Sequence, residues 1–265
     1  MPIIRSLQNE RVKAAVKLRD RRGRDKQGRI IIDGLRELGH ALTANVDIVE
    51  AFHCAELADS AVATDLLSKL EGTSTELTAV TAPVWEKLAF GSRRDGIVAI
   101  AKPPNKQLAD VRIRNSALIV VLDALEKPGN IGAIIRSADA AGADGVLVVD
   151  SGTDLYNPNT IRASVGTVFR LPVVATSGTD AIGWLREHEI AIYLARVGAG
   201  TRYTEPDYRQ RCAIVMGSEA TGLDDKWNQP DFHAVHLPMY GAADSLNVAV
   251  ATAVLLYEVV RRKTG

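Results

Sequence analysis

Three short segments of the chain carry polar side chains that could act together in a reaction. The first, EKPGNIGAIIRSADAAG, contains Asn130 and Arg136, and its isoleucines recur at helical spacing. We expect Asn130 to be the N-cap of this helix, after a turn formed by Pro128 and Gly129. An amide and a guanidinium can hold a phosphate or a hydroxyl through hydrogen bonds. The segment therefore predicts a polar site near the helix start, or else Arg136 is an ordinary solvent-facing residue.

The other two segments each follow an apolar run. In VMGSEATGLDD, Gly217 comes directly after the run and allows close backbone approach, while Glu219 offers a carboxylate that could orient a partner. In LPMYGAADSLNVAVATAVLLYE, we expect Ser245 to cap the final helix, with Asn247 in its first turn. Because asparagine is a poor helix former, its presence there indicates that its amide has another partner. Taken singly, each feature also has an ordinary structural explanation.

The elements that must position these segments are strands of one sheet. Short, nearly continuous apolar runs cover residues 117–125, 145–150, 171–176, 190–196, 212–217 and 233–239. Continuous hydrophobicity predicts strands covered on both faces, and therefore a mainly parallel sheet. Ligands bind beyond the carboxyl ends of parallel strands, so the three segments lie where a site is expected.

The first half of the chain alternates strand and helix patterns. Strands are predicted at 30–33, 46–54, 75–80 and 96–102, and helices at 6–20, at 35–45, in a stretch ending at 71 and at 82–90. The stretch 21–29 reads as a basic loop. We predict an α/β domain over residues 1–104, a polar linker over 105–115 that directly follows Pro103 and Pro104, and a second α/β domain over 116–265.

The composition favours a folded protein of a reducing compartment. Apolar residues make up 46% of the chain and charged residues 24%. The two cysteines, Cys54 and Cys212, are far apart, so we expect neither a disulfide framework nor a metal site. No segment has the pattern of a signal peptide or a membrane span, which favours a soluble, cytoplasmic protein. Residues 1–30 hold ten Lys or Arg against three Asp or Glu, a local charge of +7 that predicts contact with a polyanion, or a solvated surface.

In their order and spacing, the three segments closely resemble the motifs of the SpoU, or TrmH-like, RNA ribose 2′-O-methyltransferases of the SPOUT class. The matches are N-x-G-x-x-x-R from Asn130, G-S-E-x-x-G-L from Gly217, and L-P-M with S-L-N-V-A-V-A from Leu237. The resemblance spans roughly residues 118–258 and includes IRASVGTVFRLPV. It implies a parallel α/β domain whose C-terminal segment threads a loop to form a trefoil knot, and it implies a homodimer.

The resemblance also implies a cofactor, S-adenosylmethionine, bound by the strand-exit loops. The cofactor-binding candidates are Leu194, Gly217, Leu237, Met239 and Leu246. The methyl group would move to a ribose 2′-hydroxyl, and the catalytic candidates are Asn130, Arg136, Glu219, Ser245 and Asn247.

Each catalytic candidate has an expected role. Because arginine stays protonated in proteins, we favour Arg136 as a fork that grips the adjacent phosphate and stabilises the developing alkoxide. A general base with a lowered pKa stays open as the alternative. Asn130 and Asn247 would orient the ribose and Arg136. Ser245 would fix its loop, and Glu219 would hold Asn130 or the loop in position.

The first domain resembles the small ribosomal-protein-like RNA-binding domain that precedes the catalytic domain in many family members. The resemblance lies in IIIDGLRELGHAL and EKLAFGSRRDGIVAIAKP, with Asp33 where glutamate is more usual. The candidates for contact with the RNA backbone are Arg21, Arg22, Arg24, Lys26, Arg93 and Arg94, with Arg162 as a further cation near the substrate. Such contacts give affinity but carry no sequence information.

We therefore predict an S-adenosylmethionine-dependent RNA ribose 2′-O-methyltransferase that acts on ribosomal RNA. A housekeeping modification and antibiotic resistance stay open as roles, as do naked RNA and an assembled particle as substrates. The alternatives are a transfer-RNA 2′-O-methyltransferase and a non-catalytic RNA-binding or ribosome-assembly factor on the same fold. The intact motif residues argue against the non-catalytic factor. The absence of G-x-G-x-x-G argues against a nicotinamide oxidoreductase.

Overall fold

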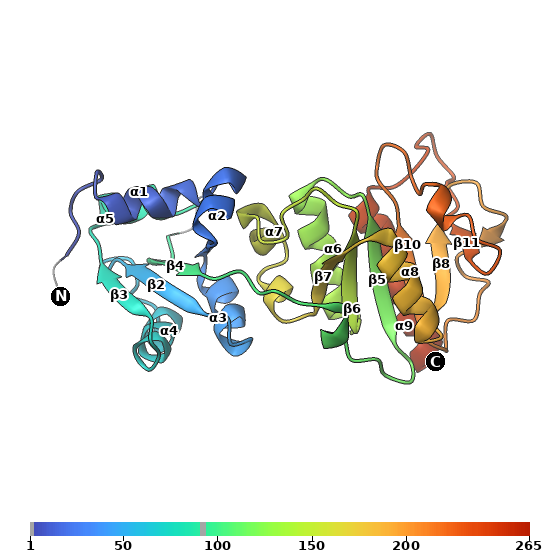
Figure 1. Cartoon of the computed structure of the whole chain (residues 1–265), viewed down its shortest axis with the longest axis horizontal. Coiled ribbons are helices and arrows are strands. Elements are labelled where there is room, and N and C mark those ends of the chain that lie inside the picture. The colour runs from blue at the N-terminus through green and yellow to red at the C-terminus, as the bar shows by residue number, and fades with distance from the viewer. Residues whose placement is uncertain (1–2, 91–93) are drawn as a thin grey trace. The chain divides into compact units, whose positions relative to one another are not determined.

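The chain forms two compact units, each with its own sheet and core (Figure 1). The computed structural model describes residues 3–90 and 94–265. The first unit comprises Met1–Pro104 with Tyr156–Arg170, and the second comprises Asn105–Leu155 with Leu171–Gly265. The first unit thus contains residues 156–170 in addition to the N-terminal part of the chain.

The first unit is built on a four-stranded mixed sheet of order β1-β4-β2-β3. Its strands are β1 (Ile30–Asp33), β2 (Ile48–His53), β3 (Glu76–Ala79) and β4 (Ile97–Ala101). β4 runs antiparallel to both neighbours, and β2 pairs with β3 in parallel. The helices are α1 (Glu10–Lys17), α2 (Arg21–Gln27), α3 (Leu35–Thr43), α4 (Ala61–Glu71), α5 (Ala82–Leu88) and α7 (Pro158–Ala163), with a 3-10 turn η2 (Thr167–Phe169). Phe52 and Trp85 are fully buried in the core between this sheet and its helices.

Residues 156–170 belong to the first unit because they pack closely on its elements. Arg162 on α7 donates a hydrogen bond to the carbonyl oxygen of Phe90. Gly166 has a left-handed φ of +83°, and a side chain there would collide with the backbone of Glu37 on α3. The sequence pattern could not reveal this packing, because the segment follows β6 directly and is separated from α3 by more than a hundred residues.

The expected basic loop at residues 21–29 is a helix, α2, so that prediction was wrong. Gly28 ends the helix in the left-handed conformation with φ +59°. Arg24 is only 4% exposed, and its guanidinium donates to the carbonyl oxygens of Leu18 at 2.7 Å and Arg19 at 2.8 Å. Arg24 thus satisfies the free carbonyl groups at the end of α1, and it is not available to a phosphate.

The second unit contains a seven-stranded sheet, parallel throughout, as the apolar runs predicted. Its order is β7-β6-β5-β10-β8-β11-β9. The strands are β5 (Leu118–Asp123), β6 (Gly145–Val149), β7 (Val173–Thr176), β8 (Ala191–Ala195), β9 (Thr201–Arg202), β10 (Cys212–Met216) and β11 (His233–His236). The helices are α6 (Pro128–Ala140), α8 (Gly178–Glu187) and α9 (Val248–Thr264), with 3-10 turns η1 (Leu108–Asp110) and η3 (Asp225–Trp227). α8 covers one face of the sheet, and α6 and α9 pack on each other across the other face (Figure 1).

The predicted linker over residues 105–115 is part of the second unit. Gln107 and Asp110 form a reciprocal capping box around η1. Val111 is 6% exposed and packs into the core of the second unit with Ile119. Because most residues of this stretch are polar, the sequence did not indicate that Val111 is buried in the core.

The two helices that begin at the sheet's exit edge start differently from the predictions. α6 begins at Pro128, which is favoured at a first helical position because it has no N–H group to satisfy. Asn130 therefore lies in the first turn and is not the N-cap. Asn247, not Ser245, is the N-cap of α9: its Oδ1 accepts from the Ala249 N–H at 3.0 Å. Both corrections leave the amides of the two asparagines at the same sheet edge.

Among the described residues, no helix combines the length and the apolar character needed to cross a membrane.

Candidate active site

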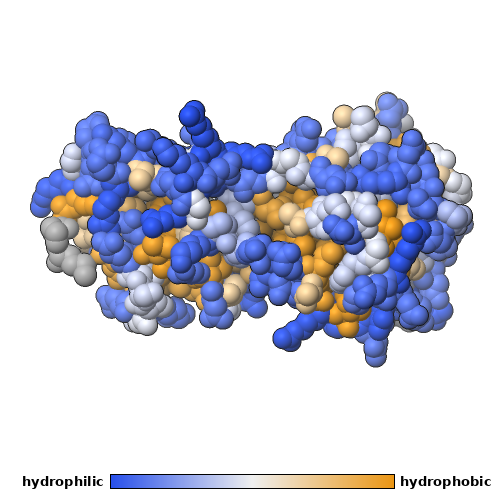
Figure 2. All heavy atoms as spheres, in the orientation of Figure 1, coloured by the Kyte–Doolittle hydropathy of each residue, from blue (hydrophilic) through white to orange (hydrophobic). Residues whose placement is uncertain are grey.

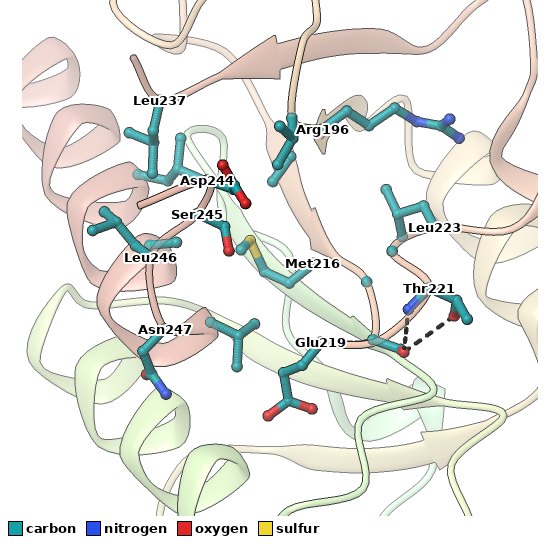
Figure 3. Close-up of a pocket in the computed structure, with 18 of the residues that line it drawn as sticks. Arg196, Met216, Glu219, Thr221, Leu223, Leu237, Asp244, Ser245, Leu246 and Asn247 are labelled. Carbon is teal, nitrogen blue, oxygen red and sulfur yellow. Dashed lines mark hydrogen bonds between the residues drawn. The ribbon is translucent and has the colours of Figure 1, made fainter. Parts of the chain in front are cut away.

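A cavity of about 670 Å³ opens at the carboxyl ends of β8, β10 and β11 (Figure 3). Its walls come from the loops after these strands and from the start of α9. The size is typical of a small-molecule site. Four of the five cofactor candidates line the cavity: Gly217, Leu237, Met239 and Leu246. Leu194 does not; it is 3% exposed on β8 and packs in the core.

Gly217 is required by the loop's own backbone. A Cβ atom at this position would lie 2.4 Å from the carbonyl carbon of Gly222. Ser218 and Gly222 exchange two backbone hydrogen bonds, of 3.1 and 3.0 Å, so the loop folds back on itself directly after β10. The close approach that the glycine permits is therefore between two parts of the chain, and the tight loop forms one wall of the cavity.

Three catalytic candidates form a chain of hydrogen bonds. The Nδ2 of Asn247 donates to the Oδ1 of Asn130 at 3.3 Å, and the Nδ2 of Asn130 donates to Glu219. The Nζ of Lys127 lies 3.7 Å from the same Glu219 carboxylate. Because the Oδ1 of Asn247 already caps α9, its NH₂ group must face Asn130. The helix cap therefore sets the donor-to-acceptor direction of the hydrogen bonds from Asn247 through Asn130, which end on the Glu219 carboxylate.

The register of the sheet explains why these residues meet. β5 and β10 are neighbours, and Leu122 pairs with Met216 at their exit ends. The loop to α6, with Asn130, and the loop with Glu219 therefore leave the sheet side by side. α9 packs on α6, which brings Asn247 to the same place.

The other two catalytic candidates stand apart from the hydrogen-bonded chain. Ser245 is exposed and lines the cavity. Arg136 is exposed on α6, does not line the cavity, and forms neither a hydrogen bond nor an ion pair with any residue that the structure describes. Its guanidinium is thus free to bind an external group.

Three charged residues of the cavity wall were absent from the sequence predictions. These are Lys127, Arg196 and Asp244. Asp244 immediately precedes Ser245, and that proximity to the third motif was the one signal that could have indicated it. The Arg196 side chain extends away from the other lining residues (Figure 3).

An ionic network centred on the buried Asp123 lies at the same edge of the sheet. The Nζ of Lys226 on η3 lies 2.7 Å from Asp123 at the end of β5, 3.1 Å from Asp150 after β6 and 2.8 Å from Asp224. Burial alone would lower the pKa of Lys226, but its hydrogen bonds to the three carboxylates raise the pKa above the usual value. A Cβ atom at Gly178 would lie 2.7 Å from the end of the Lys226 side chain, so a larger residue there would displace this lysine from its position. The network joins the loop after β10 to the ends of β5 and β6.

The candidate RNA-contacting cations of the first unit have different environments. Those exposed to solvent are Arg21, Arg22, Lys26 and Arg94, of which Arg21 lies 3.7 Å from Asp25 and Arg94 lies 3.2 Å from Glu86. Arg24 is buried, as described above, and Arg93 lies outside the described residues.

Arg162 is half-buried beside an unusual carboxyl group. The carboxyl of Asp33 accepts a hydrogen bond from the Phe90 N–H, while Arg162 donates to the Phe90 carbonyl oxygen. Burial raises the pKa of Asp33 to about 6, against the opposing effects of the Phe90 N–H and the Arg162 charge. Arg162 therefore has an internal role in the first unit.

Solved structures with this fold identify the class of protein. A crystal structure of an RNA 2′-O ribose methyltransferase matches with a TM-score of 0.85 and 37% identity, over 99% of each chain. The AdoMet-bound rRNA methyltransferase from Sinorhizobium meliloti matches with a TM-score of 0.89 and 27% identity, over 100% of this chain and 99% of that one. The fold and its exit-edge cavity are those of an S-adenosylmethionine-dependent methyltransferase of the SPOUT class.

The sequence relationship then gives the family. Residues 117–257 match the SpoU rRNA Methylase family, and residues 9–99 match the MRM3-like substrate binding domain. The 23S rRNA (guanosine(2553)-2′-O)-methyltransferase RlmP of Bacillus subtilis strain 168 is 30% identical over 97% of this chain and 98% of its own length. The 23S rRNA (uridine(2479)-2′-O)-methyltransferase of Streptomyces viridochromogenes is 30% identical over 93% of this chain and 87% of its own. The chain belongs to the SpoU rRNA Methylase family, which confirms the predicted resemblance.

The residues of the cavity fit the cofactor of this class. Leu237, Met239 and Leu246 offer apolar surface for a nucleoside, and the wall includes carboxylates that suit a cationic ligand. Over residues 3–90 and 94–265, no group of His, Cys, Asp and Glu is arranged to hold a metal ion.

Proposed function

We propose that this protein methylates a ribose 2′-hydroxyl of ribosomal RNA, using S-adenosylmethionine bound in the exit-edge cavity. The observation that carries the proposal is the Asn247–Asn130–Glu219 chain of hydrogen bonds, whose two end residues line the cavity. The two curated relatives described above are named as 23S rRNA 2′-O-methyltransferases, which supports ribosomal RNA as the substrate.

The cavity residues would hold the cofactor by shape and by backbone groups. Gly217, Leu237, Met239 and Leu246 would contact it, and Leu194 would support the wall from the core. The bound cofactor supplies a methyl group on a sulfonium. Since the reaction is a single in-line displacement, most of the catalysis available to the protein is the placement of the two reactants.

The polar residues would place the ribose and stabilise the charge that develops on it. Asn130 and Asn247 are held in one orientation by the α9 cap and by Glu219, so their amides can position a hydroxyl without reorganising. Ser245 would fix the loop before α9. Arg136 would grip the phosphate next to the reacting ribose and stabilise the developing alkoxide. A guanidinium stays protonated in proteins, so this role suits Arg136 better than that of a general base.

A homodimer with a knotted C-terminal segment completes the proposal. Val250, Val254 and Tyr257 form an apolar stripe on α9 with exposures of 50%, 36% and 53%. A second copy of the chain would cover this stripe. Arg136 does not line the cavity of its own chain, which supports an arrangement where Arg136 of the partner subunit acts there. The knot is supported by the path of the chain, which leaves β11 beyond β8 and returns to α9 beside α6 and β10.

The first unit would bind the RNA backbone in the cytoplasm. Its exposed cations on α2 are Arg21, Arg22 and Lys26, and the surface over α1 and α2 is hydrophilic (Figure 2, upper left). Contacts of this kind supply affinity and positioning. Arg94 would add a contact from the segment before β4. Arg162 would hold the 156–170 segment on the first unit rather than bind RNA, because its guanidinium is engaged with Phe90.

The direct test is methyl transfer from labelled S-adenosylmethionine to unmodified ribosomal RNA and to ribosomal particles, with ribose methylation mapped by resistance to alkali. We expect one new 2′-O-methyl site. Arg136→Ala should lower kcat by a factor of about 10² to 10³, as for loss of one charge-stabilising donor, while binding RNA and cofactor normally. Arg112→Ala, which removes another exposed arginine of the second unit, is the control.

Each other outcome has a distinct meaning. Unchanged turnover in Arg136→Ala would remove this residue from the mechanism. Cofactor binding without transfer to any RNA or particle would contradict the enzymatic function and favour an RNA-binding factor. Methylation of transfer RNA alone would correct the substrate.

A further inference from the structure

Asp244 is a carboxylate of the cavity wall with no role in the mechanism above. It lies in the loop before α9, next to Ser245, and is exposed to the cavity and solvent. Figure 3 shows it among the lining side chains, on the same loop as Ser245 and Leu246. Within the described part of the chain, it forms no hydrogen bond or ion pair.

The charges of the cavity wall leave this carboxylate unbalanced. Four charged residues line the cavity: Lys127, Arg196, Glu219 and Asp244. Lys127 and Glu219 lie 3.7 Å apart, and Glu219 also accepts from Asn130. The Arg196 side chain extends away from the other lining residues (Figure 3). Asp244 therefore has no neutralising cation among the described residues, and it gives its side of the cavity a local preference for a cation.

We propose that Asp244 binds the sulfonium end of S-adenosylmethionine and makes the site prefer this cofactor to its product, S-adenosylhomocysteine. The proposal rests on the placement of the cofactor in this cavity. Asp244 lies three residues before Asn247, which the proposed function places near the methyl acceptor, and both residues line the cavity. The methyl-bearing sulfur must also lie near the acceptor, so of the two cationic groups of the cofactor, the sulfonium and the α-ammonium, we assign the sulfonium to Asp244.

The charge on the sulfur of the cofactor changes during the reaction, and this change affects how Asp244 interacts with the product. When the methyl group forms its new bond to the ribose oxygen, the electron pair of the broken C–S bond stays on sulfur, and the hydroxyl proton is lost to solvent. The sulfur becomes neutral, so its attraction to Asp244 disappears. Because the attraction already weakens in the transition state, Asp244 favours cofactor binding and product release and does not lower the chemical barrier.

The test measures the affinity of the full-length protein for three ligands by titration calorimetry, without RNA. The ligands are S-adenosylmethionine, S-adenosylhomocysteine and sinefungin, in which an amine replaces the sulfonium. Asp244→Asn should weaken binding of the two ligands with a cationic centre at that position by about fivefold, the effect of one partly exposed ion pair. Binding of S-adenosylhomocysteine should change by less than about twofold. With RNA, the KM for the cofactor should rise by the same factor while kcat does not fall.

Two variants serve as controls. Asp139→Asn makes the same charge change on the exposed surface of α6, outside the cavity wall, and should leave all three affinities unchanged. Asp244→Glu keeps the charge and should keep the preference for S-adenosylmethionine.

Equal weakening of S-adenosylmethionine and S-adenosylhomocysteine in Asp244→Asn, or no change in either, would overturn the proposal. Ala251→Phe, which fills the cavity from α9, separates this failure from a failure of the cofactor placement. If Ala251→Phe abolishes binding but Asp244→Asn leaves the ratio of affinities unchanged, only the role of Asp244 is wrong. If Ala251→Phe binds the cofactor normally, the placement is wrong, and the role of Asp244 is overturned with it.

Discussion

Replacing Lys226 by methionine should strongly destabilise the second unit, because it leaves the buried carboxylate of Asp123 without its cation. The side chain of Asp123 is 2% exposed, and that of Lys226 is 26% exposed. Breaking a buried ion pair by removing one partner costs about 3–5 kcal/mol. The side chains of Asp150 and Asp224 are 43% and 60% exposed, so these pairs contribute at most about 1 kcal/mol each. We expect a total loss of about 4 kcal/mol in the free energy of unfolding.

The assay must report on the second unit alone, since two units need not unfold together. The chain has three tryptophans, of which Trp85 lies in the first unit and Trp184 and Trp227 in the second. In a Trp85→Phe background, urea unfolding followed by fluorescence measures the second unit. For a unit of this size, 4 kcal/mol corresponds to a fall in Tm of roughly 10 °C.

A double-mutant cycle tests the assigned cause. Asp123→Asn in the Lys226→Met background removes the unpaired buried charge and should recover about 2 kcal/mol of the free energy of unfolding. Lys106→Met removes an exposed lysine of the same unit and should change the stability by less than about 0.5 kcal/mol. A loss below about 1 kcal/mol in Lys226→Met, or no recovery in the double variant, would refute the reasoning.

Two further predictions concern the catalytic chain and the first unit. Glu219→Ala removes the acceptor that orients the Asn130 amide, and a hydrogen bond to a charged group is worth roughly 1.5 kcal/mol when it holds a group in place for the reaction. The kcat of Glu219→Ala should therefore fall about tenfold at normal stability, whereas Glu219→Gln, which keeps an acceptor oxygen, should stay within about threefold. An equal loss in both variants, measured as single-turnover methyl transfer, would contradict this role. For Asp33, burial raises the pKa from 3.8 to about 6, so the folded carboxyl holds its proton more readily than the unfolded one. The first unit should lose stability as the pH rises from about 4 to about 6 and remain less stable above that range. Asp33→Asn can still accept from Phe90, and it should flatten this pH dependence and stabilise the unit at pH 7 by up to about 3 kcal/mol. Urea unfolding followed by fluorescence in a Trp184→Phe, Trp227→Phe background, where Trp85 alone reports, checks this, and an unchanged pH profile in the variant would exclude Asp33 as its source.

The strands were predictable because burial on both faces leaves a continuous apolar run. β5, β6 and β10 are buried at every position, and the sequence shows each one plainly. β9 was missed, because a two-residue strand leaves no periodicity. The predicted starts of α6 and α9 differ from the observed ones, because Asn, Ser and Pro all favour helix N-termini. Only the hydrogen bonds show which residue caps the helix.

The site was predictable where residues stand in local motifs, and not where partners come from distant parts of the chain. Asn130 and Glu219 each occur in a recognisable segment. Lys226, by contrast, is separated by about a hundred residues from Asp123, and neither carries a local pattern that indicates a pair. Asp244 was overlooked for a different reason, since an acid in a loop of small residues is typical of any exposed turn.

The position of the two catalytic amides comes from the backbone, and their side-chain hydrogen bonds set only which way each amide faces. Bonds between solvent-exposed groups contribute little net free energy, and the Asn247–Asn130 bond is exposed and 3.3 Å long. Its geometry persists because Asn247 caps a helix anchored by the buried Leu255 and Leu256, and because Asn130 lies in the first turn of α6, where Ile131 is fully buried. Each amide is therefore tied to a helix end that the core holds in place. The sheet thus presents polar groups to solvent in a set arrangement without burying them, which leaves room for a large RNA substrate to reach them.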